Sequence, residues 1–129
     1  MILLDTDIVI DLLRKYPPAI SWLNTLDEER IILPGFVLME LIQGTRNNVE
    51  QKKIEKELKS YGAIWPSSET CDKALSVFAD CHLSHGLGIL DALIGQMAVS
   101  LNLPLYTFNR RHYEALPGLQ IIQPYVKTP

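Results

Sequence analysis

The chain has 129 residues and a formal net charge of −3, and 47% of its residues are hydrophobic. This size and composition predict a single domain over residues 1–129 with a real core, and the acidic balance excludes a strongly basic nucleic-acid-binding surface. The apolar runs are shorter than the ~20 residues that a membrane span needs, and the start has no basic n-region, so we expect a cytoplasmic protein.

Short apolar strands alternate with helical patterns, which favours an α/β fold with a mostly parallel sheet. In chain order, the expected elements are a strand at 2–4, helices at 6–15 and 17–26, a strand at 31–33, a helix that carries Glu40 and ends at Gly44, a helix at 48–60, a strand at 63–65, helices at 67–83 and 89–101, a strand at 103–107, a helical turn at 110–115 and a strand at 119–122. Cys71 and Cys81 fall on one helix, too far apart for a disulfide.

Three acidic residues stand alone in apolar runs: Asp5 in ILLD, Glu40 in FVLMELI and Asp91 in GILDALIG. A carboxylate among core-forming residues is costly unless a positive or hydrogen-bonding group compensates it. These runs contain no Lys or Arg. The pattern therefore suggests that a bound divalent cation supplies the compensating charge.

The three acids could meet at one edge of the sheet. Asp5 follows the first strand, where open parallel sheets form their sites. Glu40 lies on the helix face that leans toward the core. Asp91 begins a helix in which Gly95 and Ala98 share its face, and these small residues would allow a close approach to the sheet. A cluster is geometrically reasonable.

Hard carboxylate oxygens without a His or Cys partner suit Mg²⁺ or Mn²⁺ better than Zn²⁺. Such a site can lower the pKa of a bound water and orient the water toward a phosphodiester. A third acid beside the ion can position or deprotonate that water. The residue types therefore indicate metal-dependent hydrolysis of a phosphate ester.

Two of the acids also have purely local interpretations. Asp91 fits a helix cap, and Asp5 fits an ordinary strand-to-helix Asx residue. Glu40 has no obvious backbone partner. Asp11 shares a helical stripe with basic residues at 14 and 15, so we expect it in a surface ion pair. His112, beside two arginines, belongs to a small basic spot that either contacts phosphates or lies in solvent.

Five segments carry a resemblance to a known family: LLDTDIVIDLL at 3–13, LMELIQG at 38–44, LDALIGQMA at 90–98, YTFN at 106–109 and LPGLQII at 116–122. In this order, they make the chain similar to the PIN-domain family, and in particular to the VapC-type toxins of type II toxin–antitoxin modules. The resemblance implies a PIN-like α/β fold, a five-stranded mostly parallel sheet flanked by helices.

The resemblance also implies an activity and partners. Such proteins are Mg²⁺- or Mn²⁺-dependent endoribonucleases, commonly homodimers, and a cognate antitoxin covers their acidic pocket. Carried over residue by residue, it implies that Asp5, Glu40 and Asp91 form the catalytic and metal-binding centre. It places Thr107 and Asn109 as substrate-binding residues near the RNA.

Two positions depart from the commoner family pattern. Asn109 stands where the family has an acidic or amide residue, and an amide brings no charge to a second metal. Asp7 stands where the family often has Asn. Asp7 therefore either offsets that missing charge or caps the first helix.

Other classes remain open. The run from Asp5 to Val9 fits the DxDx[TV] pattern of haloacid-dehalogenase-like phosphatases, in which the first Asp is a nucleophile. The acidic pair that such enzymes carry after a late strand is absent here. A receiver-like domain would need a Lys directly after the strand that contains Tyr106, which is also absent. A catalytically inactive PIN-like domain that only binds a protein is the third alternative.

Overall fold

The computed structural model describes residues 1–27 and 29–127. Its five strands form one sheet in the order β3-β2-β1-β4-β5, and each neighbouring pair is parallel. The strands are β1 (Ile2–Leu4), β2 (Ile31–Pro34), β3 (Gly62–Ile64), β4 (Leu105–Tyr106) and β5 (Ile121–Ile122). The predicted α/β fold with a five-stranded parallel sheet is confirmed.

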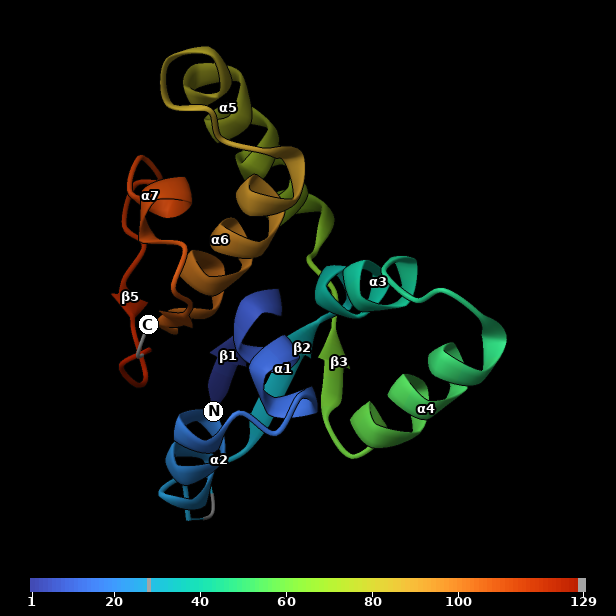
Figure 1. The fold of residues 1–129 in the computed structure, drawn as a ribbon. Helices are drawn as coiled ribbons and strands as arrows, with labels where there is room; N and C mark the ends of the chain where they lie inside the picture. Colours follow the sequence, from blue (N-terminus) through green and yellow to red (C-terminus); the bar gives the residue numbers. More distant parts are fainter. Residues whose placement is uncertain (28, 128–129) are drawn as a thin grey trace.

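Helices connect and cover the strands. They are α1 (Thr6–Leu13), α2 (Pro17–Asn24), α3 (Gly35–Gln43), α4 (Asn48–Leu58), α5 (Ser68–His85), α6 (Ile89–Leu101) and α7 (Arg110–Tyr113). Figure 1 shows α5 and α6 packed together on one side of the molecule and α3 and α4 together on the other, with α1 between the two pairs. The first turn of α1 therefore lies near elements from distant parts of the sequence.

The central strand is the most buried part of the sheet. All three residues of β1 are buried, because the strand pairs with β2 on one edge and β4 on the other. Ile8, Val9 and Leu12 continue this core from the inner face of α1. The burial of such apolar side chains is the main stabilising contribution to a fold of this size. The burial of β1 and α1 also fixes the position of the turn at the carboxyl end of β1.

Several boundaries differ from those predicted. Helix α1 ends at Leu13 instead of residue 15, because Lys15 has a left-handed φ of 58° and the following Tyr16 precedes a proline. Strand β4 starts only at Leu105, since Pro104 has no N–H to donate to a ladder. Most other ends shift by one or two residues. The ends predicted for the Glu40 and Asp91 helices are confirmed at Gly44 and Leu101.

Gly95 provides the close approach that its size suggests, but its nearest neighbours are not in the sheet. A Cβ atom at Gly95 would lie 2.6 Å from Cδ1 of Leu116 and 3.3 Å from Cδ1 of Tyr113. The absence of a side chain on α6 therefore makes room for the segment that follows β4. This packing holds the ring of Tyr113 one helical turn beyond Asp91.

Two simpler expectations can be checked directly. Both cysteines are free, as predicted, and each is half-buried. Among the helices of the described residues, none combines the length and the apolar character that a bilayer crossing requires.

Candidate active site

Asp5 occupies the turn between β1 and α1. It is the N-cap of α1, where the Thr6 backbone N–H donates to its Oδ1 at 2.8 Å and the Thr107 hydroxyl donates to its Oδ2 at 2.9 Å. The residue is only 4% exposed. Burial, and after it the charge of Asp7, raises the pKa of the Asp5 carboxyl to about 6. Asp5 thus has the predicted Asx role and still carries an uncompensated charge.

Asp7 ties the first helix to the segment after β4. Its Oδ2 accepts the Phe108 backbone N–H at 2.8 Å and lies 3.4 Å from the Thr107 hydroxyl. Asp5 is the N-cap of α1, and Asp7 adds to the capping of this helix from its first turn, because its Oδ1 accepts the Ile8 backbone N–H at 2.8 Å. Burial raises the pKa of Asp7. Asp7 therefore adds a second carboxylate beside Asp5 and at the same time fixes the corner that carries Thr107.

Glu40 reaches this corner from α3. The Thr6 hydroxyl donates to Oε1 of Glu40 at 3.1 Å, which links α3 to the first turn of α1. Burial raises the pKa of Glu40, the Thr6 hydrogen bond lowers it, and the charges of Asp5 and Asp91 raise it again. The three predicted acids therefore share one electrostatic environment, which we call the acidic centre (Asp5, Glu40 and Asp91).

Asp91 is the third residue of α6. The backbone N–H of Gly88 donates to its Oδ2 at 3.2 Å, so the local capping interpretation is also correct. The same oxygen lies 3.9 Å from Nδ1 of His112. The basic spot predicted around His112 is thus placed beside the acidic centre.

Tyr113 was not singled out in the sequence, where an aromatic residue in a helical turn resembles ordinary core. It is 1% exposed, and among the described residues its hydroxyl has no hydrogen-bond partner. Burial, followed by the charges of Asp5 and Asp91, raises the pKa of Tyr113. The hydroxyl is near enough to Asp5 to lower the pKa of that carboxyl, although the pair lacks the geometry of a formed hydrogen bond.

The described residues contain no group of three or more His, Cys, Asp or Glu side chains already arranged to hold a metal ion. The ion pairs of Lys and Arg within this part of the chain also do not involve Asp5, Glu40 or Asp91. The three carboxylates are therefore collected in one region without a paired Lys or Arg among the described residues, and His112 lies beside Asp91.

The two predicted substrate residues differ in exposure. Thr107 is fully buried, and its hydroxyl is within hydrogen-bonding distance of the carboxylates of both Asp5 and Asp7. Asn109 is exposed at the start of α7, and its backbone N–H donates to the Thr107 hydroxyl at 3.0 Å. Of these two, Asn109 is thus the one whose side chain solvent can reach.

Asp11 does not form the ion pair that was predicted within its helix. Its Oδ2 accepts the Tyr125 hydroxyl at 2.7 Å and lies 3.0 Å from Nζ of Lys127. The Lys127 ammonium also lies 4.4 Å from the centre of the Phe108 ring. The final described residues therefore fold back across α1, and their partner is Asp11 rather than the basic residues at 14 and 15.

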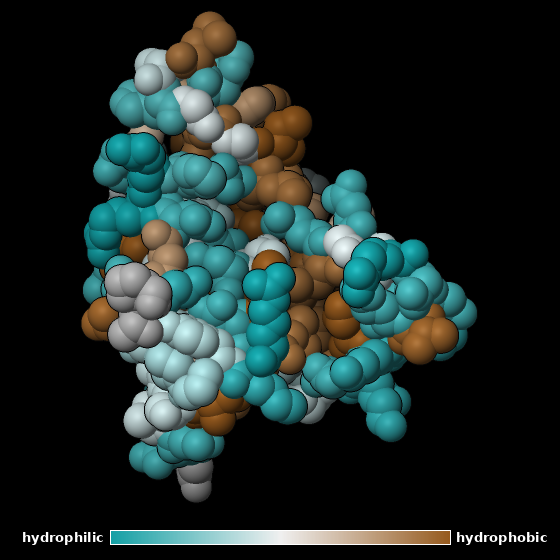
Figure 2. Space-filling view, in the orientation of Figure 1, coloured by the Kyte–Doolittle hydropathy of each residue, from teal (hydrophilic) through white to brown (hydrophobic). Residues whose placement is uncertain are grey.

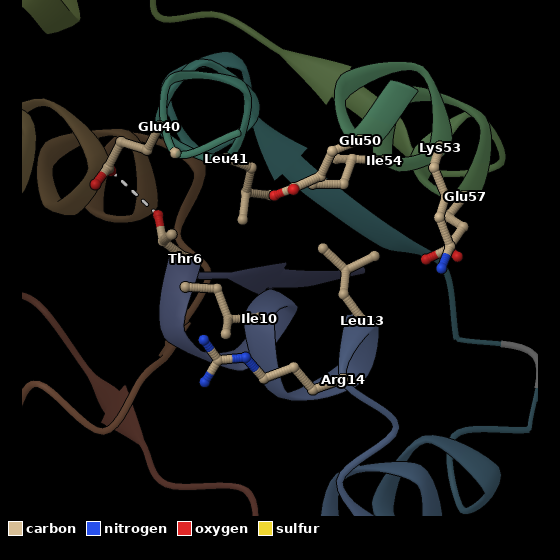
Figure 3. Close-up of a pocket in the computed structure, with 11 residues that line it drawn as sticks. Thr6, Ile10, Leu13, Arg14, Glu40, Leu41, Glu50, Lys53, Ile54 and Glu57 are labelled. Carbon is tan, nitrogen blue, oxygen red and sulfur yellow. Dashed lines mark hydrogen bonds between the residues drawn. The ribbon is translucent and has the colours of Figure 1, made fainter. Parts of the chain in front are cut away.

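A groove of about 480 Å³ runs from the acidic centre between α1, α3 and α4. Figure 3 shows the Thr6–Glu40 hydrogen bond at one end of this groove. Figure 2 shows apolar atoms exposed in the hollow, between polar rims. Its apolar lining includes Ile10, Leu13, Leu41 and Ile54, and its charged lining includes Arg14, Glu50, Lys53 and Glu57.

The fold is the one expected of a single family. Residues 2–116 match the sequence profile of the PIN domain. The chain belongs to the PIN-domain family. This assignment removes the haloacid-dehalogenase-like and receiver-like alternatives, and it leaves the activity of this particular PIN domain to experiment.

Several solved structures share the PIN fold over almost the whole chain. A toxin–antitoxin complex from Klebsiella pneumoniae is 22% identical with a TM-score of 0.77, covering 97% of this chain and 98% of that one. VapBC2 from Rickettsia felis, bound to a promoter DNA fragment, is 24% identical with a TM-score of 0.78, covering 95% and 98%. VapBC-1 from nontypeable Haemophilus influenzae is 25% identical with a TM-score of 0.76, covering 95% and 97%. A comparison with curated proteins finds no match.

Proposed function

We propose that this PIN domain is a VapC-type toxin that acts in the cytoplasm as a Mg²⁺- or Mn²⁺-dependent endoribonuclease. The observation that supports the proposal is that three carboxylates lie in one region near the carboxyl end of β1, where the charges of Asp5 and Asp91 both raise the pKa of Glu40. Crowded, partly buried acids are unfavourable unless a cation compensates them. The likeness to solved toxin–antitoxin complexes supports the same assignment.

The donor set fits a hard divalent cation. Asp5, Glu40 and Asp91 offer carboxylate oxygens, which Mg²⁺ and Mn²⁺ prefer. Burial, and after it the charge of Asp7, raises the pKa of Asp5, so a cation beside this carboxylate would be favourable. These three residues would hold the ion. When bound, such an ion lowers the pKa of a water and stabilises the charge that develops on a phosphodiester.

The residues of the chain have separate tasks in this proposal. Thr107 orients Asp5 through its hydroxyl. Glu40 is half-buried with a raised pKa, which suits a group that accepts a proton from the attacking water. Asn109 and the exposed basic residues at 110–112 stand where they can contact the phosphates of a single-stranded RNA.

Cleavage of labelled single-stranded RNA by the purified chain tests the activity. We expect cleavage with Mg²⁺ or Mn²⁺, its loss on chelation, and its loss in Asp5→Asn and Asp91→Asn while circular dichroism stays native. Arg46→Ala, on the exposed loop before α4, serves as a control that should cut normally. Full activity of either Asn variant would contradict the proposal. No cleavage by the native chain, together with tight partner binding, would favour the inactive protein-binding alternative.

We also propose that the antitoxin occupies the groove beside the acidic centre. The apolar lining suits the hydrophobic face of an inserted helix, and the Glu40 end suits a basic side chain of the partner. A bound segment would then block the approach of RNA to Asp5 and Asp91. We expect the partner to be a small protein encoded next to this gene.

Binding to that neighbouring gene product can be measured with two variants of α4. Ile54→Asp places a charge in the groove and should weaken binding at least tenfold. Val49→Asp makes the same kind of change on the same helix at an 81% exposed side chain outside the groove, and it should bind normally. Equal binding by both variants would mean that the antitoxin interface lies outside the groove.

A second copy of the chain is the proposed occupant of the apolar surface on α5 and α6. Leu75 and Ile89 are each 66% exposed there and line the same shallow pocket as Leu93. An uncharged patch of this kind suits the self-complementary interface of a two-fold dimer. Light scattering should find a dimer for the native chain and for Leu83→Glu, and a monomer for Leu75→Glu. A monomeric native chain would exclude the homodimer.

A further inference from the structure

Tyr113 has a buried hydroxyl whose hydrogen-bonding capacity is unused. Its side chain belongs to the hydrophobic core, yet within the described residues the hydroxyl has no partner. A buried polar group of this kind is normally satisfied by protein or ordered water, because leaving it unpaired is costly. A tyrosine at this position is therefore harder to explain by packing alone than a phenylalanine would be.

The ring of Tyr113 packs against α6. Gly95 of α6 has no side chain, and a Cβ atom there would already lie 3.3 Å from Cδ1 of Tyr113. The backbone of Tyr113 is also held, because its carbonyl accepts the N–H of Leu116 at 3.0 Å. Because Gly95 lies four residues beyond Asp91 on α6, the ring sits beside the helix face that carries Asp91.

The Tyr113 hydroxyl interacts electrostatically with the acidic centre. Burial raises the pKa of Tyr113 and the charges of Asp5, Asp91 and Asp7 add to this, while the hydroxyl in turn lowers the pKa of Asp5. Together with the packing of the ring beside Gly95, on the helix face that carries Asp91, these interactions indicate that the hydroxyl lies near the acidic centre. Thr6 and Thr107 already donate one hydrogen bond each to the Asp5 carboxylate, which has about four acceptor positions.

We propose that Tyr113 is a positioning residue of the acidic centre, whose hydroxyl donates a hydrogen bond to the Asp5 carboxylate when a divalent cation is bound. This inference rests on the proposed function, because it assigns a supporting role at the same site. With Thr6 and Thr107, Tyr113 then forms a set of donors that hold Asp5 in one orientation. Such supporting donors typically change metal affinity by 10- to 100-fold.

Tyr113→Phe removes only the hydroxyl, and the substitution should weaken Mn²⁺ binding without lowering the stability of the metal-free chain. Without metal, the free energy of unfolding should stay equal or rise, because the lost group had no partner. The dissociation constant for Mn²⁺, measured by titration calorimetry, should rise about 10-fold. A merely structural tyrosine would show the reverse, a less stable protein with unchanged Mn²⁺ affinity.

Tyr125→Phe is the matched control. It removes the same atom from a tyrosine whose hydroxyl donates to Asp11 at 2.7 Å. We expect this variant to unfold more easily and to bind Mn²⁺ like the native chain.

The outcomes separate the two proposals. If the native chain binds Mn²⁺ and Asp5→Asn does not, but Tyr113→Phe binds as tightly as native, the role of Tyr113 is wrong and the proposed function stands. If the native chain binds no Mn²⁺, both fail. A loss of metal-free stability in Tyr113→Phe would also overturn the inference, since it would reveal a structural partner.

Discussion

The hydroxyl of Thr107 donates a hydrogen bond to Oδ2 of Asp5 over 2.9 Å, although the two residues are 102 positions apart. The strands that directly precede them, β1 and β4, are neighbours in the sheet, and the Asp5 backbone N–H donates to the Tyr106 carbonyl at 3.0 Å. Thr107 is therefore the means by which the late strand holds the first acid in place. The parallel pairing of two short strands is what brings them together.

Replacement of Thr107 by Val tests this relationship. Val has nearly the same shape, but it leaves the buried Asp5 carboxylate and the Asn109 N–H without the hydroxyl. We expect the variant to lose about 1–3 kcal/mol of unfolding free energy, the range for unpairing a buried polar group. Thr107→Ser keeps the hydroxyl and should lose less. Equal losses in urea titrations of the two variants would mean that the methyl group, not the hydrogen bond, matters.

The fold was predictable because its signals are local. Runs such as ILL at 2–4 and IIL at 31–33 are too short and too apolar for surface structure, so their alternation with helical periods indicated a parallel sheet. The exact ends of the helices and strands were harder to predict from the sequence. They depend on Lys15, which adopts a left-handed conformation, and on Pro104, which interrupts a strand pattern.

The candidate site was predictable only in part. Isolated charges in apolar runs revealed Asp5, Glu40 and Asp91, since burial of a charge leaves a visible contrast in sequence. The contacts that orient them are tertiary and leave no such contrast. Asp11 shows the difficulty: its helical neighbours suggested a local ion pair, whereas its partners Tyr125 and Lys127 are more than a hundred residues away.

The stability of the metal-free chain should depend on pH in an unusual direction. The carboxyl of Asp5 has a pKa of about 6 in the folded state against 3.8 as a model value, so the folded state binds more protons between these values. The unfolding free energy should therefore increase as the pH falls from 7 toward 4, by up to about 3 kcal/mol from this group. Asp5→Asn should flatten most of this dependence, and the remainder belongs to Asp7 and Glu40, whose pKa values are also raised. A native chain that only loses stability below pH 7 would contradict the expectation.

The packing of residues 123–127 against α1 should depend on Asp11. Asp11→Ala removes the acceptor of the Tyr125 hydroxyl and the partner of Lys127, and we expect a loss of about 1–2 kcal/mol, as for a charge-assisted hydrogen bond. Limited proteolysis should then cut the chain near residues 123–127 before the rest unfolds. Arg14→Ala, at the residue that the sequence suggested as the partner, should change stability by less than about 0.5 kcal/mol. Equal effects of the two substitutions would instead support an ion pair between Asp11 and Arg14 within the helix.

Gly95 should tolerate no larger residue, because α6 and the segment after β4 meet there. A Cβ atom would lie 2.6 Å from Cδ1 of Leu116, a buried side chain that must shift to make room. We expect Gly95→Ala to cost about 1–3 kcal/mol, the usual range for overpacking, despite the better helix propensity of Ala. Gly44→Ala is the control, since its Cβ would meet only ordinary contacts of 3.6 Å and its backbone is right-handed helical. That variant should be neutral or more stable by a few tenths of a kcal/mol. If Gly95→Ala were equally well tolerated, the ring of Tyr113 could not be as tightly seated as its neighbours indicate.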